Sequence, residues 1–237
     1  YLLGGIYLVV LLLVAQNLTN PPEGWVLPAA ANAKGKIGTT TVNSVNLKTA
    51  LTMNQFYLLW VILFINVTAG MAIISNLSPM VQSQLGVNAV LAGTIVFVSS
   101  LFNGAGRIFW ASLSDKIGRK NIFLIMLISQ IPLFLLLPKA GNIFIFGAMS
   151  CYILSCLGGG FATMPSFATD TFGPKNIGAV YGKILLAWGI AGVVGPMLME
   201  YFKKVSNTFT LALTVAAALL SLGVILVLLY KKPKNQP

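Results

Sequence analysis

Several apolar runs in this sequence reach the roughly 20 residues that a helix needs to cross the hydrocarbon core of a bilayer. Apolar residues make up 57% of the 237 residues and charged residues only 8%, whereas soluble domains carry about 25% charged residues. A soluble domain has no means of covering this much apolar surface. The sequence therefore predicts an all-α, polytopic membrane protein.

We expect six full spans joined by short loops, so that helices adjacent in sequence run antiparallel and pack side by side. The expected spans are 55–76, 88–112, 121–137, 142–166, 179–201 and 208–230. Together they form one six-helix bundle over residues 55–230.

Three further segments flank the bundle. Residues 1–17 are an apolar run that we interpret as the end of another membrane helix, residues 18–54 form a polar loop, and residues 231–237 form a basic tail. The first residue is Tyr1, and the run that follows lacks the basic flank and the cleavage site of a signal peptide. We therefore expect a fragment of a longer protein whose amino-terminal part is missing.

The distribution of basic residues predicts the orientation in the membrane. If the loop 18–54 is cytoplasmic, the inside loops and the tail hold ten basic residues and the outside loops hold three. This bias predicts a cytoplasmic carboxyl terminus in a plasma (inner) membrane, with membrane lipids as partners. The net charge of +11 does not indicate nucleic-acid binding, because the basic residues are scattered over short loops rather than gathered on one soluble face.

The residue inventory argues against an enzyme. The sequence has no histidine, which excludes Ser-His and Cys-His nucleophiles and histidine-ligated haem or zinc. Cys151 and Cys156 lie in one apolar run, where small packing residues are expected rather than a disulfide or a metal site. We expect no catalytic residue, no metal site and no cofactor.

The loop after the second full span has the chemistry of a charged helix end. Residues 111–120 read Ala-Ser-Leu-Ser-Asp-Lys-Ile-Gly-Arg-Lys. Asp115 can pair with Arg119 or accept backbone N–H groups at the start of the next helix. Gly118 permits a turn conformation that other residues resist. The alternative is an ordinary solvated loop.

This loop resembles the G-x-L-x-D-R-x-G-R-[KR] signature of the major facilitator superfamily, which lies between the second and third helices of each six-helix half. Asp115, Gly118 and Arg119 fall on its strongest positions, while Ala111 replaces its opening glycine. The loop's place after a long polar segment matches the carboxyl-terminal half of a twelve-helix fold. Residues 1–17 then resemble helix six.

Other stretches resemble the oxalate/formate antiporter family of that superfamily. They are NPPEGW (20–25), QFYLLWVILFINVTAG (55–70), NGAGR (103–107), GGGFATMPSFATDTFG (158–173) and AWGIAGVVGP (187–196). The resemblance implies a secondary transporter in which two six-helix halves rock about a central site, so the missing amino-terminal half is an expected partner. It also assigns Asp115, Gly118 and Arg119 to a conformational latch.

Arg107 is a charge inside an apolar segment. Burying an arginine at a helix centre costs at least about 2.5 kcal/mol, although a side chain near a helix end can extend to the interface. Ser100, Asn103 and Arg107 stand at i, i+3 and i+7 and so share one stripe of the helix. A water-filled cavity explains these polar companions, whereas an arginine that extends along lipid does not require them.

The expected ligand is a small organic anion. The four acidic residues are Glu23, Asp115, Asp170 and Glu200, and none lies deep in an expected span. An arginine in a cavity without a fixed counter-ion suits a carboxylate, which it can bind in a two-pronged geometry. The resemblance agrees, because family members carry a functional arginine at the position of Arg107.

The resemblance also bears on substrate choice. Oxalate carriers have a second cation at the position of Trp188 and aromatic residues at those of Leu157 and Phe161, and related proton-coupled carriers have an aspartate where this chain has Asn103. A single cation favours a monocarboxylate such as formate or lactate over oxalate. Phe161 and Trp188 would form apolar walls of the site, unless they only pack between helices.

Two alternatives remain open at this stage. The protein is a facilitator of another substrate class, or it is a membrane sensor that binds the ligand without moving it. Lys183 also lies in an apolar segment, but near the expected cytoplasmic end, where it can extend to the interface.

Overall fold

The computed structural model describes residues 2–16 and 44–233. The chain divides into two units, Tyr1–Thr41 and Val42–Pro237. In the first, the apolar helix α1 (Leu2–Ala15) exposes every side chain from residue 4 to its end. The predicted loop 18–54 lies mostly outside the described residues, as do the stretch 20–25 and the end of the tail.

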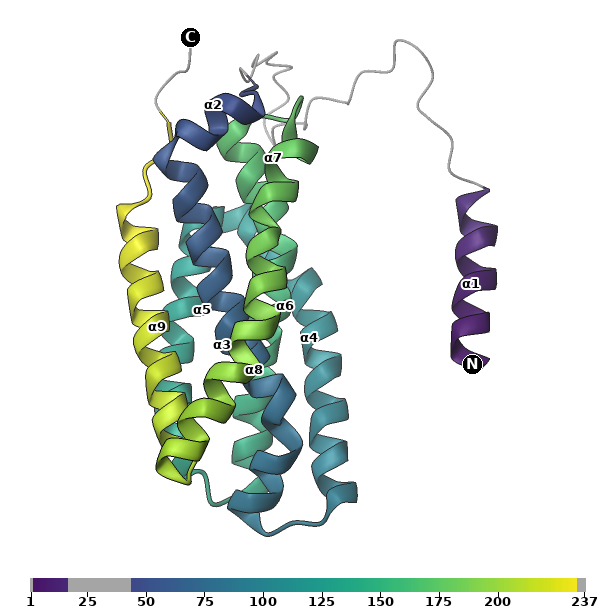
Figure 1. Cartoon of the computed structure of the whole chain (residues 1–237), viewed down its shortest axis with the longest axis vertical. Coiled ribbons are helices and arrows are strands. Elements are labelled where there is room, and N and C mark those ends of the chain that lie inside the picture. The colour runs from purple at the N-terminus through teal and green to yellow at the C-terminus, as the bar shows by residue number, and fades with distance from the viewer. Residues whose placement is uncertain (1, 17–43, 234–237) are drawn as a thin grey trace. The chain divides into compact units, whose positions relative to one another are not determined.

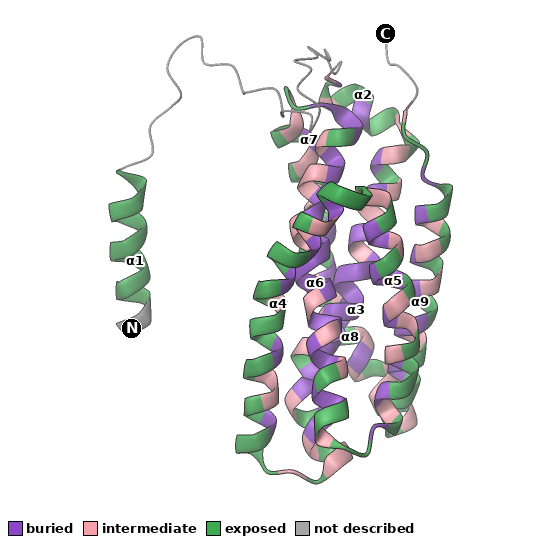
Figure 2. Cartoon of the chain, turned by 180° about the vertical axis from the view of Figure 1, so that it is seen from behind, coloured by how far each residue is buried: buried purple, intermediate pink, exposed green. Residues whose placement is uncertain are grey.

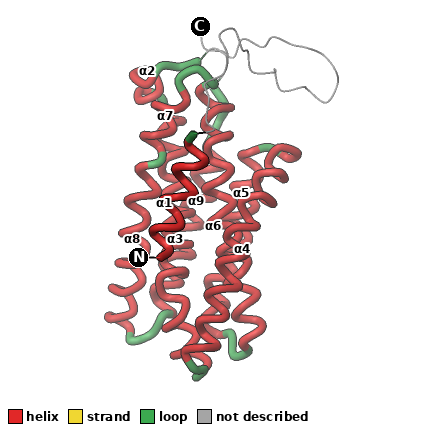
Figure 3. The backbone as a smooth tube through the Cα atoms, turned by 90° about the vertical axis from the view of Figure 1, so that its right-hand side faces the viewer, coloured by secondary structure: helices red, strands yellow, loops and turns green. Residues whose placement is uncertain are grey.

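The second unit contains six helices of membrane-spanning length and composition, and the predicted all-α, six-span membrane fold is confirmed (Figure 1). The described ranges contain no strand, and loops gather at the two ends of the unit (Figure 3). The helices are α2 (Leu47–Thr52), α3 (Asn54–Leu85), α4 (Ala89–Ile117), α5 (Arg119–Leu136), the 3₁₀ turn η1 (Leu137–Lys139), α6 (Ile143–Phe172), α7 (Ile177–Ile184), α8 (Leu186–Ser206) and α9 (Thr210–Leu229).

Helix α3 continues well beyond the expected span 55–76 and contains Pro79. Its polar residues can remain helical because their side chains bond to carbonyl groups of the preceding turn, as Ser75 Oγ does to Met71 O at 2.7 Å. The helix ends at Gly86, whose φ of 63° forms a left-handed cap. Helix α3 is therefore longer than the expected span.

The short helix α2 lies within the segment expected to be a loop. Asn46 caps it by accepting a hydrogen bond from the backbone N–H of Thr49 at 2.8 Å. The fifth span is also divided, because α7 ends at Ile184 and α8 begins at Leu186. The expected single helix 179–201 is thus two helices that meet at Leu185.

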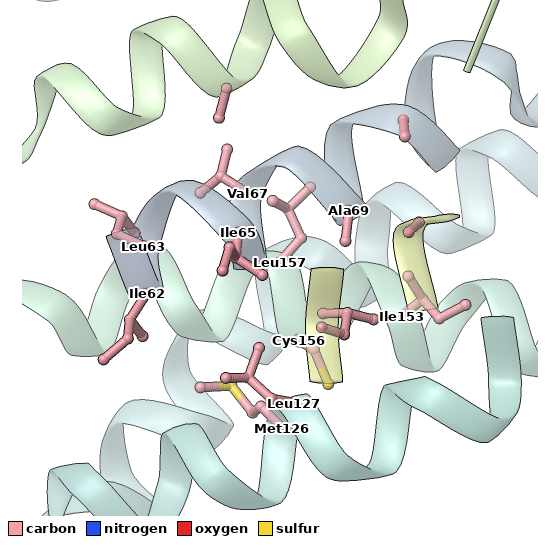
Figure 4. Close-up of a cluster of buried hydrophobic side chains, with 14 of the residues drawn as sticks. Ile62, Leu63, Ile65, Val67, Ala69, Met126, Leu127, Ile153, Cys156 and Leu157 are labelled. Atoms are coloured by element: carbon pink, nitrogen blue, oxygen red, sulfur yellow. The ribbon is translucent and has the colours of Figure 1, made fainter. Parts of the chain in front are cut away.

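Helices α3 and α6 form the centre of the six-helix unit. In each, 61% of the most apolar window is buried, against 17% for α4 and 22% for the span made of α7 and α8 (Figure 2). Helix α3 packs against α6, α8 and α9, while α4 packs chiefly against α6. Figure 4 shows part of the core, with side chains from α3, α5 and α6: Ile62, Leu63, Ile65, Val67, Ala69, Met126, Leu127, Ile153, Cys156 and Leu157.

Buried amides join the three helices that meet in this core. Asn66 of α3 donates from Nδ2 to the carbonyl oxygen of Cys156 on α6 at 3.3 Å. Gln130 of α5 donates from Nε2 to Asn66 Oδ1 at 3.4 Å. Both side chains are fully buried. In a bilayer such interhelical hydrogen bonds contribute roughly 0.6 kcal/mol each, so they orient the helices more than they stabilise them.

Glycine residues bring α4 and α6 into backbone contact. A Cβ atom at Gly106 would lie 2.3 Å from the carbonyl oxygen of Ser155, and one at Gly158 would lie 2.0 Å from that of Asn103. Both distances are too short for any side chain. Glycine at these two positions therefore sets how closely the two helices approach.

Substitution of Gly106 by alanine should loosen this contact. The added methyl group must displace the backbone of Ser155, and overpacking of this kind costs about 1–3 kcal/mol. We expect Gly106→Ala to lower the midpoint of thermal unfolding in detergent. Gly104→Ala is the matched control, because a Cβ atom there would meet nothing within 4 Å. Equal midpoints for the two variants would contradict this account of the α4–α6 contact.

Candidate functional site

Arg107 contacts Phe161, whose ring pairs with that of Trp188 on another helix. Its guanidinium carbon lies 5.2 Å from the ring centroid of Phe161 on α6. The Phe161 ring lies 5.9 Å from that of Trp188 on α8, with 54° between the ring planes. The structure thus brings together three residues that the sequence analysis selected separately. We call Arg107, Phe161 and Trp188 the arginine–aromatic cluster.

The cluster is partly open. Arg107 is exposed, Phe161 is half-buried and Trp188 is 43% exposed. A guanidinium over an aromatic ring gains about 0.5–1 kcal/mol at an exposed position. The guanidinium carries five N–H donors in a fixed planar fork.

No carboxylate of the described ranges forms an ion pair with Arg107. The ion pairs there join Arg119 to Asp115 and Asp170, and Lys203 to Glu200. Nor do those ranges contain a group of three or more His, Cys, Asp or Glu side chains that could hold a metal ion. Arg107 therefore offers a positive charge and a planar set of donors, which together suit a carboxylate.

The polar stripe on α4 continues from Arg107 towards the start of the helix. Asn103 is half-buried against Gly158, and its Oδ1 is buried without a hydrogen-bond partner in the described part of the chain. Ser100 is exposed, and its hydroxyl donates to the carbonyl oxygen of Val96 at 2.8 Å. Asn103 thus packs in the α4–α6 contact, whereas Ser100 is accessible but bonded to its own helix.

Lys183 does not join this cluster. It is exposed in the last turn of α7, the helix that precedes the break at Leu185. Trp188 follows on the first turn of α8. The two side chains therefore belong to different helices, although they are only five positions apart in the chain.

A second charged group lies where α4 ends and α5 begins. Arg119 forms an ion pair and hydrogen bond with Asp115, donates to Ser114 Oγ, and lies 3.5 Å from Asp170 Oδ2 on α6. Of the two arrangements considered for Asp115, the structure has the pairing with Arg119. Gly118 joins the helices with a φ of 92°, a conformation that favours glycine.

The sequence analysis did not assign Asp170 to this charged group. The signal that could have identified it is its position near the end of the fourth span, which reaches the same end of the bundle as the loop 111–120. An arginine shared between two carboxylates links α4, α5 and α6 electrostatically. Asp115 and Asp170 are more than half exposed, so dissolved salt weakens the electrostatic attraction within these two ion pairs.

The end of α9 and the residue that follows it form hydrogen bonds at the same end of the bundle. Lys120 donates from Nζ to the carbonyl oxygens of Leu228 at 3.1 Å and Tyr230 at 2.8 Å. The Tyr230 hydroxyl shares a hydrogen bond of 2.7 Å with Thr171 Oγ1 on α6. Burial raises the pKa of the Tyr230 phenol, and the hydrogen bond to Thr171 partly opposes this shift.

Comparisons with known proteins agree with the loop motif. A sequence model of the Major Facilitator Superfamily matches residues 1–196 and 59–237. The chain is 32% identical over 171 residues to the oxalate:formate antiporter of Oxalobacter formigenes, which covers 71% of this chain and 40% of that protein.

Two further relatives are similar over shorter stretches. An uncharacterized MFS-type transporter of Escherichia coli, YhjX, is 30% identical over 141 residues, which are 59% of this chain and 35% of that protein. Apicoplast pyruvate carrier 1 of Toxoplasma gondii is 30% identical over 152 residues, 60% of this chain and 27% of the carrier.

The chain spans less than half of the length of each of these relatives. The resemblance noted for the loop 111–120 is nevertheless confirmed by the family match, which extends over more than half of this chain, and that noted for the helix stretches is supported by the similarity to the oxalate:formate antiporter. The chain belongs to the Major Facilitator Superfamily.

Proposed function

We propose that the protein is a secondary transporter of small organic anions that works by alternating access, and that Arg107 binds the carboxylate of the substrate. The observation that carries this proposal is the arginine–aromatic cluster, whose three residues come from three helices. Its cation, Arg107, is exposed and forms no ion pair with a carboxylate of the described ranges. The names of two relatives support the substrate class, since oxalate, formate and pyruvate are all carboxylates.

The finer proposal is a preference for monocarboxylates over oxalate. Trp188 occupies the position at which the family resemblance predicts a second cation in oxalate carriers, and its ring contacts Phe161. One guanidinium beside two aromatic rings would neutralise one carboxylate and pack against an apolar substituent. A dianion would bring a second charge onto apolar walls, which is unfavourable.

We further propose that Asp115, Gly118 and Arg119, together with Asp170, act as the conformational latch. These residues join the ends of α4, α5 and α6 through partly exposed ion pairs, which can break and re-form at modest cost. Alternating access also requires the second six-helix half that we expect as a partner. The basic residues favour a cytoplasmic location for the latch and the carboxyl terminus, in a plasma (inner) membrane.

The substitution Arg107→Gln tests the anion site. Removal of the charge should lower uptake of labelled formate into proteoliposomes containing the full-length protein by about tenfold or more, since hydrogen bonds to charged groups contribute roughly 1.5–3 kcal/mol. Lys183→Gln removes a cation outside the cluster and should leave uptake near that of the wild type. Normal uptake by the Arg107 variant would refute the anion site, and binding without flux in the wild type would identify a sensor.

The substitution Trp188→Lys tests the preference between substrates. A second cation beside Phe161 should raise the uptake of oxalate relative to formate, because a dianion would then meet two positive charges. Trp188→Met, which removes the ring without adding charge, is the control. A ratio of oxalate to formate uptake that is the same in both variants would count against the proposed role of Trp188.

The substitution Asp115→Asn tests the latch. It removes one partner of Arg119 and should lower the maximal rate of uptake several-fold while leaving the KM for substrate nearly unchanged. Glu200→Gln is a matched control, since it removes a partly exposed ion pair with Lys203 near the other end of the bundle. An increase in KM without a loss of maximal rate would contradict the latch assignment.

A further inference from the structure

A basic pocket lies beside the latch, on the side of the segment that follows α9. Its volume is about 600 Å³. The residues that line it are Gly118, Arg119, Lys120, Phe167, Asp170, Tyr230, Lys231 and Lys232. Four cations thus meet one carboxylate, Asp170, and Arg119 lies 3.5 Å from that carboxylate. The pocket therefore keeps a positive charge after its internal ion pair is formed.

The lysines of this pocket retain the capacity to bind an anion. Lys231 and Lys232 are exposed, and neither forms an ion pair with a carboxylate of residues 44–233. Lys120 uses two of its three ammonium protons on the carbonyl oxygens of Leu228 and Tyr230. Gly118 and Arg119 also belong to the amino-terminal end of α5, where the helix dipole adds to the positive potential.

An apolar groove adjoins the basic pocket. It lies between α3 and α9, has a volume of about 750 Å³ and shares Lys231 with the pocket. Its lining is Asn54, Gln55, Tyr57, Leu58, Val61, Leu222, Leu226, Leu229 and Lys231. Leu222 and Leu229 are exposed, so the groove opens on the surface of the six-helix unit. Polar residues occur where the groove meets the helix ends, and leucines and Val61 line its remainder.

Hydrogen bonds hold the junction between the pocket and the groove in place. Gln55 of α3 donates from Nε2 to the carbonyl oxygen of Lys231 at 3.2 Å. Lys120 of α5 donates to the carbonyl oxygens of Leu228 and Tyr230, and the Tyr230 hydroxyl shares a hydrogen bond with Thr171 Oγ1 of α6. Side chains of three helices thus position the backbone from which Lys231 extends.

We propose that the pocket and the groove together bind one anionic phospholipid. The phosphate lies among Lys120, Lys231 and Lys232, and an acyl chain lies in the groove along Leu222 and Leu226. Both features occur where apolar membrane-length helices end, which is the depth at which a lipid changes from headgroup to chain. A free phosphate would use the basic pocket alone, whereas a lipid uses both surfaces.

The headgroup half of the proposal is tested with the paired substitution K231Q/K232Q. Native mass spectrometry of the full-length protein in detergent would measure binding of phosphatidylglycerol, with phosphatidylcholine as the uncharged comparison. We expect binding of phosphatidylglycerol to weaken roughly 30-fold, since each basic residue near the surface contributes about 1 kcal/mol. K203Q/K204Q removes two adjacent lysines at the other end of the bundle and should change little. Equal effects of the two pairs would overturn the proposal.

The acyl-chain half is tested with Leu222→Trp, which narrows the groove. Ile225→Trp is the matched control, because Ile225 is exposed on the same helix but does not line the groove. We expect only Leu222→Trp to weaken phosphatidylglycerol binding, and neither variant to alter binding of glycerol 3-phosphate. If glycerol 3-phosphate displaces the lipid completely and Leu222→Trp has no effect, the site binds a free anion and the lipid assignment is wrong.

Discussion

The backbone contact between α4 and α6 is the constraint on which the candidate site depends. Gly106 and Gly158 allow the two helices to approach until a Cβ atom at either position would collide with the facing backbone. At this separation the Arg107 guanidinium lies over the Phe161 ring. A wider spacing between α4 and α6 would separate Arg107 from Phe161. The two glycines therefore determine the geometry of the arginine–aromatic contact.

Much of the architecture could be predicted from the sequence because lipid imposes a simple rule. Each span must be apolar and helical over about 20 residues, so a long apolar run in the sequence predicts both the span and its helical structure. The ends were harder to predict. Helix α3 continues through Ser75, whose hydroxyl bonds to the Met71 carbonyl, and through Pro79, and the division at Leu185 leaves no clear mark in composition.

The candidate site was predictable residue by residue but not as a set of contacts. Arg107 is conspicuous as a charge in an apolar segment, and the family resemblance indicates Phe161 and Trp188. Their contact depends on the packing of α4, α6 and α8, which no local pattern encodes. The same holds for Asp170, since its pairing with Arg119 requires that α4 and α6 end at the same level of the bundle.

The connection between α4 and α5 consists of Gly118 alone, since α4 ends at Ile117 and α5 begins at Arg119. A single residue spans only about 3.8 Å from one Cα to the next, so it supplies almost no slack. The two helices cannot slide along each other by a helical turn without unwinding an end. The end of α4 and the start of α5 therefore keep a nearly fixed distance, and Lys120 at that start is hydrogen-bonded to Leu228 in the last turn of α9 and to Tyr230.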